Sequence, residues 1–124
     1  MSENLDKARF WVNFLLEHTN FPQLAILRQH LIDAKFHTFC PCGCYSFEIT
    51  VSDRNALPAL MPPKPSLEKG DFGFFTYDRQ LTDGRQLTLT AFCDSEGMLS
   101  GIDVDVNTNT EPVPDPEEAA RLLG

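Results

Sequence analysis

Apolar residues near the start of the chain recur at helical spacing. Within residues 5–18 they fall every three or four positions, which is typical of a helix that buries one face. They are Leu5, Ala8, Trp11, Val12, Leu15 and Leu16. A second helix is expected over residues 22–32, with Pro22 in its first turn. Because the connection is short, the two helices should be neighbours, with Trp11 in the core.

After residue 34 the apolar period changes to two, which predicts strands. Every second residue from Tyr45 to Val51 is apolar, as in a strand with one buried and one solvated face. The apolar run 34–39 precedes the cysteine stretch 40–44, so we expect a hairpin whose connection is that stretch. The proline-rich segment 53–71 that follows predicts a long loop.

The second half of the chain predicts three antiparallel strands joined by tight turns. Two strand-like runs, 72–80 and 86–93, flank Asp83-Gly84, and Asp-Gly in this position is a strong hairpin signal. A second turn at residues 94–97 leads into a third run, 98–106. These runs predict a meander of neighbouring strands.

The third of these runs carries two acids on its polar side. Asp103 and Asp105 alternate with apolar residues, so their carboxylates should stand about 7 Å apart on the solvated face. Further along, Asp115 and Pro116 can cap and begin a short C-terminal helix.

These elements predict a single α+β domain over residues 1–124. Two N-terminal helices should pack on one face of an antiparallel sheet of about five strands, and a short C-terminal helix should follow. A chain of 124 residues can bury a core of this kind without a disulfide or a metal.

Charge is unevenly placed along the chain. The formal net charge is −8 at pH 7, and residues 93–124 carry eight acids against Arg121 alone. Such a surface repels nucleic acid and anionic membranes, and it complements a basic protein partner. The alternative is that the acids only keep the protein soluble. No apolar run approaches the roughly 20 residues of a membrane helix and no export signal is evident, so we expect a cytoplasmic protein with reduced cysteines.

The cysteine stretch is the strongest candidate for metal chemistry. Cys40, Cys42 and Cys44 fall within five residues, and His37 precedes them, so the four side chains offer a ligand set for zinc. Cys93 is an alternative fourth ligand. The spacing differs from the usual paired zinc ligands, and buried thiols at a strand turn are the alternative explanation.

A catalytic thiol is a further alternative, in which His37 would lower the pKa of a neighbouring cysteine. No third residue that could orient such a pair is evident, and His18 and His30 lie on predicted helices without an evident partner. We therefore expect no enzyme activity.

Two stretches carry a family resemblance. Cys-Pro-Cys-Gly-Cys-Tyr-Ser-Phe-Glu-Ile, and later Glu-Gly-Met-Leu-Ser-Gly-Ile-Asp-Val before a proline-containing acidic tail, resemble a group of small uncharacterised bacterial proteins with a Cys-Gly-Cys-Gly-Cys stretch before a strand. Pro41 departs from that pattern. The resemblance covers about the last two-thirds of the chain and implies no known activity.

By size and acidity the chain also resembles immunity proteins, which neutralise bacterial toxins. The leading prediction is therefore an acidic protein-interaction module, most concretely an immunity protein that blocks a cationic toxin. The expected partner-binding residues are Asp94, Glu96, Asp103 and Asp105. A small zinc-binding domain and a thiol-dependent enzyme are the alternatives.

Overall fold

The computed structural model describes residues 3–18, 21–32, 34–39, 45–52, 56–60, 72–107 and 113–123. It contains three helices and a five-stranded sheet within these residues, and it confirms the predicted α+β class. In chain order the elements are α1 (Glu3–His18), α2 (Leu24–Leu31), β1 (Lys35–His37), β2 (Tyr45–Thr50), β3 (Phe72–Gln80), β4 (Gln86–Cys93), β5 (Leu99–Val106) and α3 (Pro116–Leu122).

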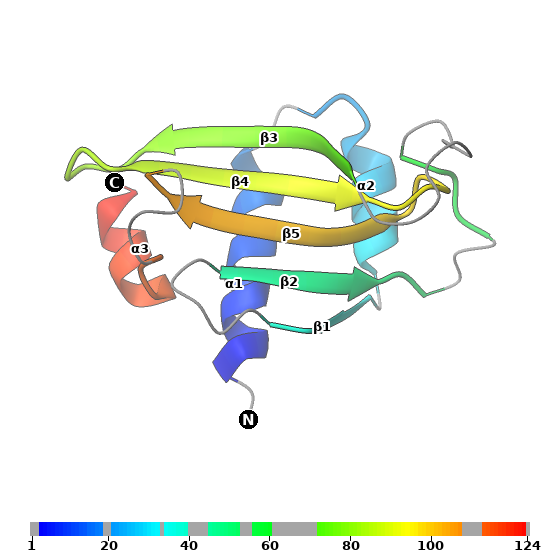
Figure 1. Ribbon diagram of the computed structural model, residues 1–124, viewed down its shortest axis with the longest axis horizontal. Helices are drawn as coiled ribbons and strands as arrows, with labels where there is room; N and C mark the ends of the chain where they lie inside the picture. Colours follow the sequence, from blue (N-terminus) through cyan, green and yellow to red (C-terminus); the bar gives the residue numbers. More distant parts are fainter. Residues whose placement is uncertain are drawn as a thin grey trace.

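The sheet has the strand order β1-β2-β5-β4-β3, and every neighbouring pair is antiparallel. The predicted meander is present as β3, β4 and β5, and β1 pairs with β2 as expected. The β1–β2 pair joins the meander where β2 pairs with β5, so that Phe47 lies opposite Ile102. Figure 1 shows the strands in this order, with α1 and α2 behind them.

The core lies between the sheet and the N-terminal helices. Alternate residues of β4 and β5 are buried, because each strand turns one face toward the helices. Trp11 is only 1% exposed, which confirms its predicted place in the core. Aromatic contacts join the layers: the ring of Phe14 on α1 lies 5.8 Å from that of Tyr77 on β3, edge to face. Among the described residues, no helix is both long and apolar enough to cross a bilayer.

The connection from β2 must reach β3 on the other side of β5 and β4, which explains its length. Part of it, residues 56–60, is attached to the rest of the fold. Leu60 is 1% exposed, and its N–H donates to the carbonyl of Gly97 at 2.8 Å. The fully buried ring of His30 donates from Nε2 to the carbonyl of Pro58 at 2.7 Å. His30, for which the sequence shows no partner, therefore holds this loop against α2.

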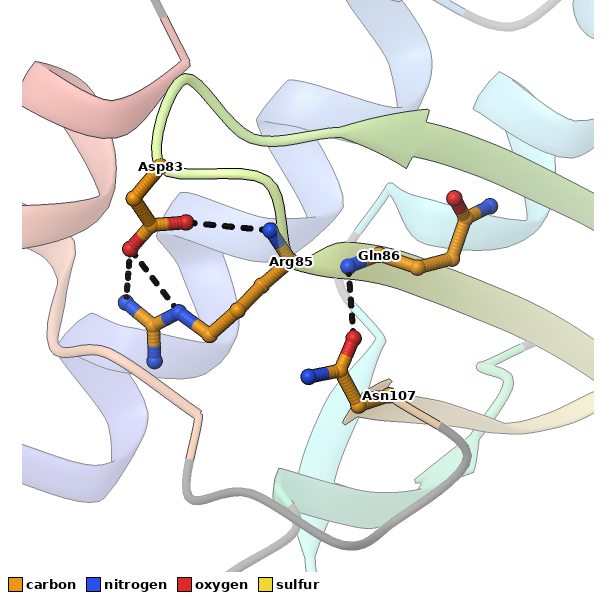
Figure 2. A network of polar contacts seen from close by, with 4 residues as sticks. All are labelled: Asp83, Arg85, Gln86 and Asn107. Carbon is orange, nitrogen blue, oxygen red and sulfur yellow. Dashed lines mark hydrogen bonds and ion pairs between the residues drawn. The ribbon is translucent and has the colours of Figure 1, made fainter.

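Polar contacts fix the β3–β4 turn as the Asp-Gly signal predicts. Gly84 has φ +95°, a conformation that glycine adopts without steric cost. The carboxylate of Asp83 accepts hydrogen bonds from the backbone N–H and the guanidinium of Arg85 (Figure 2). Beside them, Asn107 ends β5 at φ 53°, and its Oδ1 accepts from the N–H of Gln86 at 2.8 Å. These contacts fix the end of the sheet where β4 begins and β5 ends.

The predicted C-terminal helix is also present. The side chain of Asp115 accepts from the N–H of Glu118 at 3.0 Å and so caps α3, and Pro116 is its first residue. Ala119 is fully buried, and Arg79 on β3 donates to the carbonyl of Leu123 at 2.6 Å. Helix α3 is thereby fixed at the end of the sheet that carries the β3–β4 turn (Figure 1).

Candidate functional site

The sheet turns one side toward the helices, and the described helices leave its other side uncovered (Figure 1). Residues directly opposite each other on paired strands share a face, so the register defines what lies on the solvent side. We call this surface the acidic face. Its residues are Ser46, Glu48, Thr76, Asp78, Thr88, Thr90, Phe92, Ser100, Gly101, Asp103 and Asp105. Figure 1 views the sheet from this side, and no described helix lies over it.

Three carboxylates occupy neighbouring rows of the acidic face. Thr88 on β4 lies between Asp78 on β3 and Asp105 on β5, because it is opposite both. Its hydroxyl donates to Asp78 Oδ1 at 2.8 Å. One row along, Asp103 lies between Thr90 on β4 and Ser46 on β2. The backbones that carry Asp78 and Asp105 are about 10 Å apart, which is two strand spacings.

Two of these carboxylates are held in surroundings that disfavour their charge. Burial raises the pKa of Asp103, the carboxylate of Asp105 adds to the rise, and a hydrogen bond with Ser46 opposes it. Burial also raises the pKa of Asp105, and the charge of Asp78 adds to that rise. A cation placed between these groups would reverse both effects, because it favours the ionised form.

A hollow of about 310 Å³ opens on the same face. It lies where β5 has one residue more than β4. Phe92 pairs with Gly101 and Cys93 pairs with Leu99, so Ser100 is the extra residue of a β-bulge. Gly101 leaves space between Phe92 on one side and Glu48 of β2 on the other. A larger residue there would require the backbone of β2 to shift, because a Cβ on Gly101 would stand 3.0 Å from the carbonyl oxygen of Phe47.

The predicted partner-binding residues fall into two separate groups. Asp103 and Asp105 lie on the acidic face, as the alternation on β5 predicts, and part of each side chain is buried. Asp94 and Glu96 belong to the β4–β5 turn, where Asp94 Oδ1 accepts from the N–H of Glu96 at 2.9 Å and from that of Met98 at 3.1 Å. Since Asp94 comes four residues after Thr90, the turn is about 13 Å along the strand from Asp103. Asp94 therefore shapes the turn.

The candidate zinc ligands are only partly within the described residues. Cys40, Cys42 and Cys44 lie outside them, so zinc binding through these residues stays a prediction. His37 lies on β1 with Nε2 2.6 Å from Thr50 Oγ1 and Nδ1 2.8 Å from Thr38 Oγ1. In the described part of the chain, no three potential ligands come together in a metal-binding group.

Cys93, the alternative fourth ligand, is fully buried and forms no disulfide. Its alternation with Phe92 places it on the helix side of the sheet, whereas His37 pairs with Glu48 on the solvent side. Three strand spacings also separate β1 from β4, about 14 Å. One metal ion therefore cannot bind both Cys93 and His37.

Basic side chains lie on the other side of the molecule. The exposed residues Arg9 of α1 and Arg28 of α2 line a groove of about 510 Å³ between the helices and β1. Its walls are otherwise mostly apolar and include Ile32, of which 64% is exposed. The molecule thus carries these arginines on its helix side and the carboxylates of the acidic face on its sheet side.

Comparisons of the chain with protein-family models, curated proteins and solved structures gave no match. The resemblance to small bacterial proteins with a cysteine-rich stretch accordingly stays a prediction. The acidic face and its hollow include three residues that the sequence did not identify as site residues: Asp78, Phe92 and Ser100. Phe92 carried a signal, because it is an aromatic residue at a position where the alternation of β4 expects a polar one.

Proposed function

We propose that this chain is a protein-interaction module that binds a basic protein partner through its acidic face. The observation that supports this most directly is the side of the sheet over which no described helix lies (Figure 1). Asp78, Asp103 and Asp105 stand there on β3 and β5, with no described helix over them. An extended polar surface of this kind offers a basic partner several carboxylates at once, with hydroxyl groups between them.

The energetics of the carboxylates support the same conclusion. Burial raises the pKa values of Asp103 and Asp105, and the charge of one neighbouring carboxylate adds to each rise, so the free protein holds these charges at a cost in stability. Acids that served only solubility would be expected at fully exposed positions, where no such cost arises. Natural proteins retain destabilising groups where function requires them.

The most concrete form of the proposal is an immunity protein. Such a protein would use the acidic face to occupy the cationic substrate-binding surface of a toxin. It predicts that a reading frame beside the gene encodes a basic toxin, and that co-production of this chain restores growth to bacteria that make that toxin. If growth returns only with a chain whose acidic face is intact, this form is supported. Equal rescue by a charge-reversed chain overturns it.

The general proposal is tested with a basic probe and two charge-matched variants. Asp78→Lys/Asp105→Lys reverses charge on the acidic face, and Asp6→Lys/Glu17→Lys makes the same net change on exposed positions of α1. Fluorescence anisotropy with a labelled octalysine peptide measures the affinity at about 20 mM and about 300 mM NaCl.

We expect the wild-type affinity for octalysine to fall at least about tenfold between the two salt concentrations, because exposed charges are screened over about 8 Å at physiological ionic strength. At low salt the acidic-face variant should bind octalysine about tenfold more weakly than the wild type does. The α1 variant should bind it no more than about threefold more weakly, because that variant changes only the net charge. Circular dichroism checks that both variants fold. Equal losses in the two variants would show that the acidic face is not the binding surface.

A further inference from the structure

The side of the hollow at the β-bulge contains a hydroxyl group without a partner. Ser100 Oγ is shielded from solvent, and it makes no hydrogen bond. Most buried polar atoms are paired, because an unpaired one costs about 1–3 kcal/mol. A bulge leaves its extra residue outside the ladder and often redirects a side chain toward a binding site. Ser100 lines the hollow, and a rotation of its side chain toward the hollow would give the buried hydroxyl a partner there.

The other walls of the hollow combine charge with an apolar surface. Glu48 and Asp103 bring two carboxylates, and Phe92 brings an aromatic ring. That ring already covers Gly73 of β3, since a Cβ on Gly73 would stand 3.6 Å from it. The hollow lies on the other side of Phe92, beside Gly101. With about 310 Å³, the hollow is at the small end of the range for ligand pockets, roughly 300–1,000 Å³.

From this geometry we infer that the hollow beside Ser100 receives one arginine side chain of the basic partner. The inference rests on the proposed function and names the group that the acidic face recognises. A guanidinium group has five N–H donors in one plane, so it can bond a carboxylate and a hydroxyl oxygen while its flat side lies on an aromatic ring. A lysine ammonium lacks that flat surface and fork geometry. Ser100, Asp103 and Phe92 together fit arginine better than lysine.

The polar neighbours of Glu48 and Asp103 leave both carboxylates able to bind an arginine. Glu48 lies 3.9 Å from Nδ1 of His37, and Asp103 bonds Ser46, so each carboxylate has one polar neighbour. A carboxylate accepts about four hydrogen bonds, which leaves both with free capacity. Burial and the charge of Asp105 raise the pKa of Asp103, and an arginine in the hollow would act against both because it favours the ionised form.

The test uses single amino-acid probes and follows the backbone amides of the full chain by NMR. The probes are N-acetyl-arginine amide, N-acetyl-lysine amide, and N-acetyl-citrulline amide, which keeps the shape of arginine without its charge. We expect N-acetyl-arginine amide to shift the amide signals of Ser100, Gly101 and Glu48. The lysine and citrulline probes should bind at least about fivefold more weakly.

Ser100→Ala removes only the unpaired hydroxyl, and it should weaken the binding of N-acetyl-arginine amide about three- to tenfold. Its melting temperature should equal or exceed that of the wild type, because an unsatisfied buried group is lost, so unfolding cannot explain weaker binding. Phe92→Leu should reduce the preference for arginine over lysine. Asp6→Asn, at an exposed position of α1, is the matched control and should change the affinity less than about twofold.

The outcomes separate this inference from the proposed function. If arginine and lysine probes shift the same signals to the same extent, and Ser100→Ala binds as the wild type does, the arginine site is wrong. Octalysine binding that still depends on Asp78 and Asp105 would then leave the interaction module standing. If octalysine binds independently of the acidic face while N-acetyl-arginine amide still shifts Ser100, the proposed function is wrong and the hollow is only a site for free guanidinium compounds, which also overturns the partner inference.

Discussion

The backbone N–H of Leu99 donates a hydrogen bond to Nδ1 of His30 at 3.2 Å, although the two residues are 69 positions apart in the chain. The other ring nitrogen, Nε2, donates to the carbonyl of Pro58. One nitrogen accepts and the other donates, so the neutral ring satisfies both partners. His30 therefore joins three segments: α2, the loop at residues 56–60, and the start of β5 beside the hollow.

We predict that His30→Ala lowers the free energy of unfolding by about 2–5 kcal/mol. The substitution leaves the N–H of Leu99 and the carbonyl of Pro58 without partners, at about 1–3 kcal/mol each, and it opens a cavity in the core. Urea unfolding followed through the fluorescence of the buried Trp11 measures the change.

His18→Ala is the matched control for this measurement. His18 is exposed, and its Nδ1 bonds the carbonyl of Phe14 within the same helix at 2.9 Å. Its loss should cost less than about 1 kcal/mol. Equal destabilisation by the two substitutions would contradict the role assigned to His30.

The sequence predicted most elements of the fold because local patterns determine them. The runs 72–80 and 86–93 coincide with β3 and β4, since Asp83-Gly84 fixes the hairpin and every second residue of β4 is buried. The pairing of β2 with β5 was not predicted. Alternation shows which face of a strand is buried, but it does not show which strand lies beside it.

The candidate site was predicted only in part, for the same reason. Alternation along β5 placed Asp103 and Asp105 on the solvent side, as observed. The predicted meander placed β3 and β5 on either side of β4, but it did not give the register that sets both Asp78 and Asp105 opposite Thr88. The hollow depends on the bulge at Ser100, which no periodic pattern in the sequence indicates. Contacts between strands therefore require the structure.

The zinc prediction can be tested without knowing the structure of the cysteine stretch. If zinc binds Cys40, Cys42 and Cys44, protein purified without a chelator should contain about one equivalent of the metal, and Cys42→Ser should release it and destabilise the fold. Elemental analysis measures the metal, and thermal unfolding measures the stability. Less than about a tenth of an equivalent would exclude a structural zinc site.

Cys93→Ala separates the two candidates for a fourth ligand. Cys93 is buried on the helix side of the sheet, so its replacement should leave the metal content unchanged and cost about 1–2 kcal/mol of stability through lost packing. His37→Ala should reduce the metal content if His37 is the ligand. Retention of zinc by His37→Ala together with its loss from Cys93→Ala would reverse this assignment.

Asp105 and Asp83 should respond to pH with opposite signs. The pKa of Asp105 is raised from its usual 3.8, so its contribution to stability is present below that value and is lost as the pH rises through the raised pKa. Hydrogen bonds from Arg85 lower the pKa of Asp83, so its contribution is present above 3.8 and is lost as the pH falls through the lowered pKa. We predict that Asp105→Asn raises the melting temperature at pH 7 by about 1–4 °C and that Asp83→Asn lowers it.

The difference for Asp105→Asn should shrink toward zero at about pH 2.5, because the raised pKa leaves the wild-type carboxylate largely protonated there and it then resembles the amide. The difference for Asp83→Asn should shrink only as the pH falls through the lowered pKa of that carboxyl. Differential scanning calorimetry at pH 7, about pH 4 and about pH 2.5 follows the two variants beside the wild type. Asp83 on the β3–β4 turn serves as the control, since it belongs to the turn and not to the acidic face. A lower melting temperature for Asp105→Asn at pH 7 would show that the ionised carboxylate stabilises the free protein. The acidic face would then have a structural reason to exist, and the argument that its charges are held for a partner would fail.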